Sequence, residues 1–154
     1  MKRQLLHESG FTLIEAMVSL VVLSVGMIGI AALYAQGLGA GRTAQYRTEA
    51  VNLVGDMADR IRANRLGGAA YAGAPANNGC DPQNGGVNCT PIQMAAHDLF
   101  IWNQQVQQRL PNGVWQILVN PGAVPPSFQI QVSWTEVGQA APVQHQMVIQ
   151  VPGF

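Results

Sequence analysis

A charge-free segment near the start of the chain limits what this protein can fold into more than any other feature. The twenty residues Ala16–Ala35 are almost entirely apolar, and the next charge after them is Arg42. As an α-helix they would extend about 30 Å, the thickness of the hydrocarbon core of a bilayer. Lys2 and Arg3 precede the segment, so the positive-inside rule predicts a cytoplasmic N-terminus and an outward-facing remainder after Arg42.

Two ordinary explanations of this segment are a secretory signal peptide and a simple membrane anchor. The segment is longer than the roughly 7–15-residue apolar core of a signal peptide. A simple anchor leaves Glu15 unexplained, because a carboxylate at the edge of an apolar span costs up to about 3 kcal/mol unless it is protonated, reaches the interface or pairs with a cation. An ionisable residue in this position therefore indicates a function.

The residues around Glu15 resemble a known processing signal. The segment Gly10–Glu15, with the sequence GFTLIE, is similar to the cleavage motif of type IV prepilins and of the pseudopilins of type II secretion. The resemblance implies that a membrane-bound prepilin peptidase cuts after Gly10 and methylates the new N-terminal Phe11. It also implies that Glu15, fifth in the mature chain, neutralises the charged amine of a neighbouring subunit. Its place in the first helical turn, where the helix dipole favours negative charge, agrees with this role.

After Arg42 the pattern predicts that the same helix continues and packs on a globular head. Helical spacing of apolar residues gives one apolar stripe, and the sequence Leu66-Gly67-Gly68 ends it. The helix is expected to run from Thr12 to about Arg65, its first half in lipid, with a soft point at the glycines of residues 37–41. The stripe consists of Tyr46, Ala50, Leu53, Val54, Met57 and Ile61.

Residues 67–90 are expected to form a loop that contains both cysteines, Cys80 and Cys89. Such a pair forms a disulfide in an oxidising compartment and stays as two thiols in a reducing one. Because the N-terminus predicts a head outside the inner membrane, we expect the disulfide.

The last part of the chain predicts a short helix and then a sheet. Thr90 is a suitable N-cap with Pro91 in the first helical position, and the turn Leu110–Gly113 ends the helix. Its apolar face is expected to consist of Ile92, Ala95, Ala96, Leu99, Trp102, Val106 and Leu110. Alternating apolar and polar residues then predict strands at Val114–Val119, Phe128–Trp134 and Val143–Val151.

These elements predict an α+β fold, in which a long N-terminal helix packs on a small antiparallel sheet. This is also the pilin-like architecture that the resemblance implies. The expected parts are a leader peptide (1–10), a transmembrane and filament-core helix (11–41) and a periplasmic head (42–154). The expected location is the bacterial inner membrane, in a single pass, and later the pilus at the cell surface.

The head lacks the residue patterns of an enzyme or a cofactor protein. His97 and Asp98 are adjacent on a helix, so their side chains diverge by about 100° and form no dyad. Cys80, Cys89 and His97 have no evident fourth partner for zinc. His145 is expected at the edge of the core with a hydrogen bond. We therefore expect no enzyme activity, no metal, no cofactor and no small-molecule substrate.

Three arginines near the end of the long helix, Arg60, Arg62 and Arg65, are expected to lie on its solvated side. Asp56 and Asp59 compensate their charge, and basic residues are favoured at a helix C-terminus. Without interleaved aromatic residues they are a weak signal for nucleic acid, so DNA binding is not expected. A salt bridge with a neighbouring subunit is an alternative use.

Parts of the head resemble the PilV group of minor pilins, the type IV pilus modification proteins. The similar parts are Ala50–Arg65, the turn Leu110–Gly113 and the strand that ends in Trp134. The resemblance implies a low-abundance structural subunit that helps to initiate or cap a pilus. The cysteine pair precedes the predicted sheet instead of bounding a C-terminal loop, which disfavours a major-subunit role.

The resemblance also implies the partners, which are other minor and major pilins, the prepilin peptidase, and the inner membrane with its pilus assembly platform. Two alternatives remain at this point. One is a minor pseudopilin of a type II secretion system, and the other is an adhesion or DNA-uptake module at the pilus tip.

Overall fold

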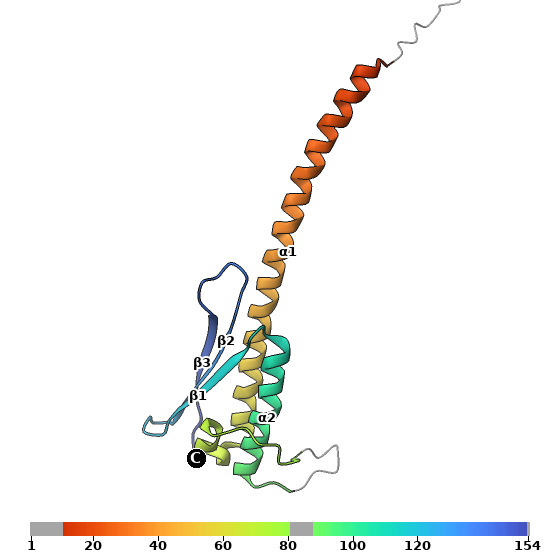
Figure 1. Ribbon diagram of the computed structural model, residues 1–154. Helices are drawn as coiled ribbons and strands as arrows, with labels where there is room; N and C mark the ends of the chain where they lie inside the picture. The colour runs from red at the N-terminus through yellow and green to blue at the C-terminus, as the bar shows by residue number, and fades with distance from the viewer. Residues whose placement is uncertain (1–10, 81–87, 154) are drawn as a thin grey trace, which may run out of the picture. The chain divides into compact units, whose positions relative to one another are not determined.

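The computed structural model describes residues 11–80 and 88–153. It confirms the predicted α+β class, in which a long N-terminal helix packs on a three-stranded antiparallel sheet (Figure 1). The chain divides into two compact units, with the boundary between Arg42 and Thr43. In chain order the elements are α1 (Leu13–Ala63), the 3₁₀ helix η1 (Arg65–Ala72), α2 (Pro91–Arg109), β1 (Val114–Asn120), β2 (Ser127–Trp134) and β3 (Val143–Gln150).

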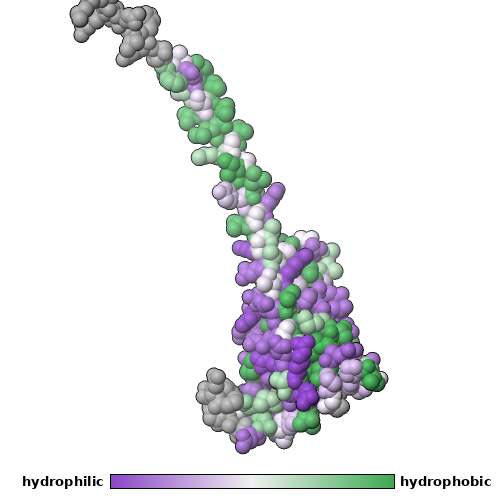
Figure 2. Space-filling model, turned by 180° about the vertical axis from the view of Figure 1, so that it is seen from behind, coloured by the Kyte–Doolittle hydropathy of each residue, from purple (hydrophilic) through white to green (hydrophobic). Residues whose placement is uncertain are grey.

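The first unit consists of the N-terminal part of α1. All its residues from Phe11 to Arg42 are exposed, and hydrophobic side chains cover much of the helix (Figure 2). Within the described part of the chain, α1 is the one helix long and apolar enough to cross a membrane. The helix is continuous through the glycines of residues 37–41, where the sequence predicted a soft point.

In the second unit the predicted apolar stripe of α1 is confirmed. Ala50, Val54 and Met57 are completely buried, Leu53 and Ile61 are 1% exposed, and Tyr46 is partly buried against the core. Trp102 of α2 reaches this stripe, and its indole N–H donates to the backbone carbonyl of Leu53 at 2.8 Å.

The sheet has the order β1-β2-β3, and both neighbouring pairs are antiparallel. The predicted strands are confirmed to within one residue at each end. In β2 the alternation is complete, because Phe128, Ile130, Val132 and Trp134 are buried and the residues between them are half-buried. One face of the sheet therefore forms the core with the helices.

Helix α2 begins as the sequence predicts. The backbone N–H of Gln93 donates to Oγ1 of Thr90 at 3.3 Å, and the backbone N–H of Thr90 donates to Oε1 of Gln93 at 3.0 Å. This reciprocal capping box satisfies two donors at the helix start. At the other end, a Cβ atom on Gly113 would lie 2.6 Å from the carbonyl oxygen of Val106, so only glycine fits this turn.

Two predictions about the head are wrong in detail. Ile92 is 65% exposed, because the buried face of α2 begins one turn later, at Ala95. The loop predicted from residue 67 starts instead as η1, which bends at Gly68 with a φ of 45°. That bend returns the chain to the core and buries Tyr71 completely.

Candidate functional site

The first turn of α1 is built around Thr12 and Glu15. The backbone N–H of Glu15 lies 3.1 Å from the carbonyl oxygen of Thr12 and 3.4 Å from its Oγ1. Thr12 therefore caps the helix, a role that the sequence analysis missed although the Thr-x-x-Glu spacing signals it. Gly10 and the predicted leader 1–10 lie outside the described residues.

The polar side chains that follow Glu15 are satisfied within the helix itself. Ser19 Oγ donates to the carbonyl oxygen of Glu15 at 2.8 Å, and Ser24 Oγ donates to that of Val21 at 2.8 Å. Hydroxyls bonded in this way can enter a bilayer without leaving an unpaired donor. Glu15 is then the one charged residue between Phe11 and Gly41, so its carboxylate requires a partner wherever this helix is in an apolar environment.

A second polar site joins three elements of the head. Asp98 of α2 accepts from Nη1 of Arg60 of α1 at 3.0 Å and from the hydroxyl of Tyr71 of η1 at 2.7 Å. Arg60 also donates to Asp56 at 2.9 Å through Nε. Both oxygens of the largely buried Asp98 therefore have a partner, and the carboxylate is compensated by the guanidinium.

The protonation of this cluster follows from its surroundings. Burial raises the pKa of Tyr71, and the hydrogen bond to Asp98 raises it further, so the phenol stays protonated and remains a donor. Burial lowers the pKa of Arg60, but its hydrogen bonds to Asp56 and Asp98 outweigh this and leave it raised. The cluster thus has fixed charges and holds α1, η1 and α2 together.

These contacts correct the prediction that Arg60 lies on a solvated face. Its side chain is only 28% exposed because Asp98, distant in sequence, packs beside it. Arg62 does form the expected exposed pair, with Asp59 at 2.8 Å, and Arg65 is exposed.

Each of the two histidines of the head has one buried ring nitrogen without a hydrogen-bond partner among the described residues. His97 stacks on Phe100, with ring centroids 6.3 Å apart, and its unpartnered atom is Nδ1. The Nε2 atom of His145 is buried and has no hydrogen-bond partner in the described residues, so the hydrogen bond expected there is absent at this atom. Across residues 11–80 and 88–153, no three His, Cys, Asp or Glu side chains are grouped so that they could hold a metal ion.

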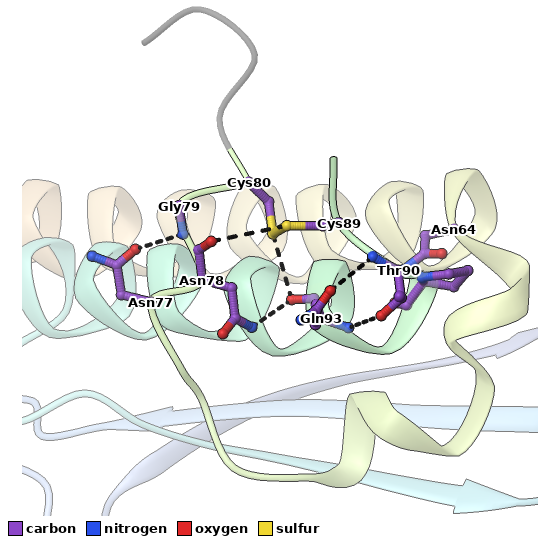
Figure 3. Close-up of a disulfide and its surroundings, with 9 residues drawn as sticks. Asn64, Asn77, Asn78, Gly79, Cys80, Cys89, Thr90 and Gln93 are labelled. Carbon is purple, nitrogen blue, oxygen red and sulfur yellow. Dashed lines mark hydrogen bonds between the residues drawn. A yellow bond between two sulfur atoms is a disulfide. The ribbon is translucent and has the colours of Figure 1, made fainter. Parts of the chain in front are cut away.

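Cys80 and Cys89 form a disulfide, the first of the two alternatives that the sequence left open, so neither sulfur is a thiolate ligand (Figure 3). The segment before Cys80 lies against α2. The backbone N–H of Ala76 donates to the carbonyl of Ala96 at 2.9 Å, and the Asn78 amide donates to that of Gln93 at 2.8 Å. The disulfide therefore fastens this segment to the N-terminus of α2.

Removal of this disulfide is expected to loosen the start of α2 more than the sheet. Replacing both cysteines with serine should lower the free energy of unfolding by about 2–3 kcal/mol, since the closed loop is short. Hydrogen exchange should then be faster at Ala76, Thr90 and Gln93, while the amides of β2 stay protected. Equal loss of protection in β2 would contradict this local role.

Comparison with known protein families gives two adjoining matches. Residues 5–31 match the prokaryotic N-terminal methylation motif, and residues 32–100 match a family described as type IV pilin Tt1218. The two matches support the type IV pilin family. No curated protein and no solved structure gave a match to the chain.

The match to the methylation motif covers the first turn of α1 and most of the apolar segment, and the match to the type IV pilin family ends within α2. The strands of the sheet lie outside both. Type IV pilins are structural subunits that associate with other pilins and are processed by prepilin peptidases, and they are not an enzyme family. The apolar helix together with the methylation motif fits a membrane-anchored pilin.

Proposed function

We propose that the protein is a minor pilin that helps to initiate or cap a type IV pilus. The observation that carries this proposal is the exposed apolar helix with one carboxylate, Glu15, in its first turn, inside the segment that matches the methylation motif. An exposed helix of this kind is stable in a bilayer or in a bundle of similar helices, and unfavourable in water.

The minor role is supported by the head. Its disulfide, between Cys80 and Cys89, precedes the sheet instead of enclosing a C-terminal loop, and Ala50–Arg65 resembles the PilV group. In this proposal residues 11–41 form the membrane and filament-core segment. Residues 42–154 form a head in the periplasm that reaches the pilus surface after assembly.

Processing at the N-terminus tests the proposal. Mass spectrometry of protein extracted from membranes should find a chain that begins at an N-methylated Phe11, because the peptidase is expected to cut after Gly10. Gly10→Val should leave the leader attached, since a branched side chain crowds the cut site. Gly37→Ala, a matched change in the apolar segment, should be processed normally. An intact Met1 in the wild-type protein, or a cut near Ala35, would contradict a pilin function.

A further inference from the structure

The two edges of the sheet differ in what lies beside them. Strand β1 lies next to η1, whose Ala69 and Ala72 line a groove together with β1 residues. Strand β3 pairs with β2 along one side and, among the described residues, has no strand along the other. The edge of β3 is therefore the open end of the sheet.

The direction of the backbone groups of β3 follows from one hydrogen bond beyond its end. The N–H of Val151 donates to the carbonyl of Pro126 at 3.0 Å, which continues the register in which Gln150 pairs with Ser127. Successive residues of an antiparallel strand direct their backbone groups alternately to opposite sides. Since Val151 points to the β2 side, the residues with backbone groups directed to the open edge are Gln144, Gln146, Val148 and Gln150.

The strand at this open edge lacks two of the usual protections against strand pairing. Its sequence, VQHQMVIQ, contains no charged residue and no proline, the devices that commonly block an edge. On the inner face its Val143, His145 and Met147 are only half-buried, whereas their neighbours in β2 are buried. A further strand would cover these half-buried side chains.

The outer face of the sheet carries rows of amides that end at β3. The side chain of Gln129 donates to Gln146 at 2.9 Å, and that of Gln131 donates to Gln144 at 2.9 Å. An amide or hydroxyl side chain on an added strand would extend these rows by the same cross-strand bonding.

We propose that the open edge of β3 receives an extended, uncharged segment of a different pilus subunit, which becomes a fourth strand of the sheet. Backbone hydrogen bonds to Gln144, Gln146 and Val148 would provide the binding. Aliphatic residues of the segment would lie on the inner face and amide or hydroxyl residues on the outer face. The inference rests on the proposed function, because it takes the partner to be a neighbouring subunit.

A second copy of this chain fits the edge less well than a different subunit does. Its β1 edge lies beside η1, which leaves its own β3 as the strand to offer. Antiparallel pairing of β3 with β3 relates the two sheets by a twofold axis normal to them. The part of α1 that packs on the sheet would then run in opposite directions in the two copies, whereas both must enter one membrane from the same side.

Hydrogen exchange of the full-length protein tests the inference. The comparison is between assembled filaments and protein extracted in detergent. Exchange at Gln144, Gln146 and Val148 is expected to slow by about tenfold or more on assembly, because these amides gain acceptors. The amide of Ile130 in the central strand should be protected in both states. The inference would be overturned if exchange at the three β3 amides were the same in filaments as in detergent-extracted protein. This includes the case in which the amides are already protected in detergent, where no other subunit is present, because that would indicate self-pairing.

Matched substitutions at one position distinguish the contribution of the backbone N–H to incorporation from that of the side chain. Gln146→Pro removes an edge donor and leaves the bonds to β2, whereas Gln146→Thr keeps the donor. Incorporation into filaments should fall by about tenfold for the first variant and stay within about twofold for the second. Val148→Lys, which retains every backbone donor but adds charge at the edge, should reduce incorporation even if the proline variant misfolds.

The two possible failures are distinct. If the wild-type chain is absent from filaments, the proposed function fails and the inference fails with it. If the wild-type chain is present and Val148→Lys is incorporated normally, only the inference is overturned.

Discussion

Replacing Glu15 with glutamine is expected to reduce incorporation into filaments by about tenfold or more while the head stays folded. The carboxylate is the one charge in the apolar part of α1, and we propose that it pairs with the amine of a neighbouring Phe11. Without the carboxylate of Glu15, that amine is left unpaired in an apolar bundle, which costs several kcal/mol. Each step of about 1.4 kcal/mol corresponds to a tenfold change in the equilibrium constant for incorporation.

The measurement is the ratio of protein in sheared filaments to protein in the membrane pool. Glu15→Ala should behave like Glu15→Gln, because the charge and not the shape is decisive. Ser19→Ala is the matched control, since it removes only a hydrogen bond to the backbone of the same helix. Incorporation of Glu15→Gln at the wild-type level would contradict the proposed role.

Replacing Asp98 with alanine is expected to destabilise the head by about 2–4 kcal/mol, since it leaves a partly buried Arg60 and a buried Tyr71 without their shared acceptor. The partial exposure of Arg60 reduces the effect below that of a fully buried pair. Denaturant unfolding of the full-length protein in detergent, followed by tryptophan fluorescence, would measure the change.

Two variants help to interpret that result. Asp59→Ala removes an ion pair of similar length whose carboxylate is 79% exposed, and it should change stability by less than about 1 kcal/mol. Tyr71→Phe should cost about 1–2 kcal/mol, because it removes little volume but loses the buried hydrogen bond to Asp98 and the longer contacts of the hydroxyl with Asn64 and with the carbonyl of Arg60. If Asp98→Ala were no more destabilising than Asp59→Ala, the cluster would not hold the three elements together.

The parts of the fold that local sequence determines could be predicted. The alternation from Phe128 to Trp134 defines a half-buried strand in any context, and the cap at Thr90 depends only on residues up to Gln93. The apolar stripe of α1 follows for the same reason, since its spacing alone identifies the buried face.

The Arg60–Asp98–Tyr71 cluster could not be predicted in this way. Asp98 lies 38 residues from Arg60 and 27 residues from Tyr71 in the sequence. Only the packing of α1, η1 and α2 brings the three side chains together. Tyr71 lay in a segment whose glycines indicated a loop, and the fold buried it because the bend at Gly68 turns the chain back to the core. The cap at Thr12, in contrast, depends only on the local Thr-x-x-Glu spacing from Thr12 to Glu15.

The way α2 is attached to α1 determines how the head responds to mechanical load. Trp102 donates to the carbonyl of Leu53, Arg60 donates to Asp98, and the side chain of Asn64 donates to the carbonyl of Pro91 at 2.8 Å. The three attachment points follow one another from Leu53 to Asn64, the residue directly after α1, which is about three helical turns at 3.6 residues per turn. A pull along the axis of α1 therefore loads these bonds in shear, so that they resist together instead of opening one after another. In a subunit built in this way, α2 stays attached to α1 when the helix is under tension.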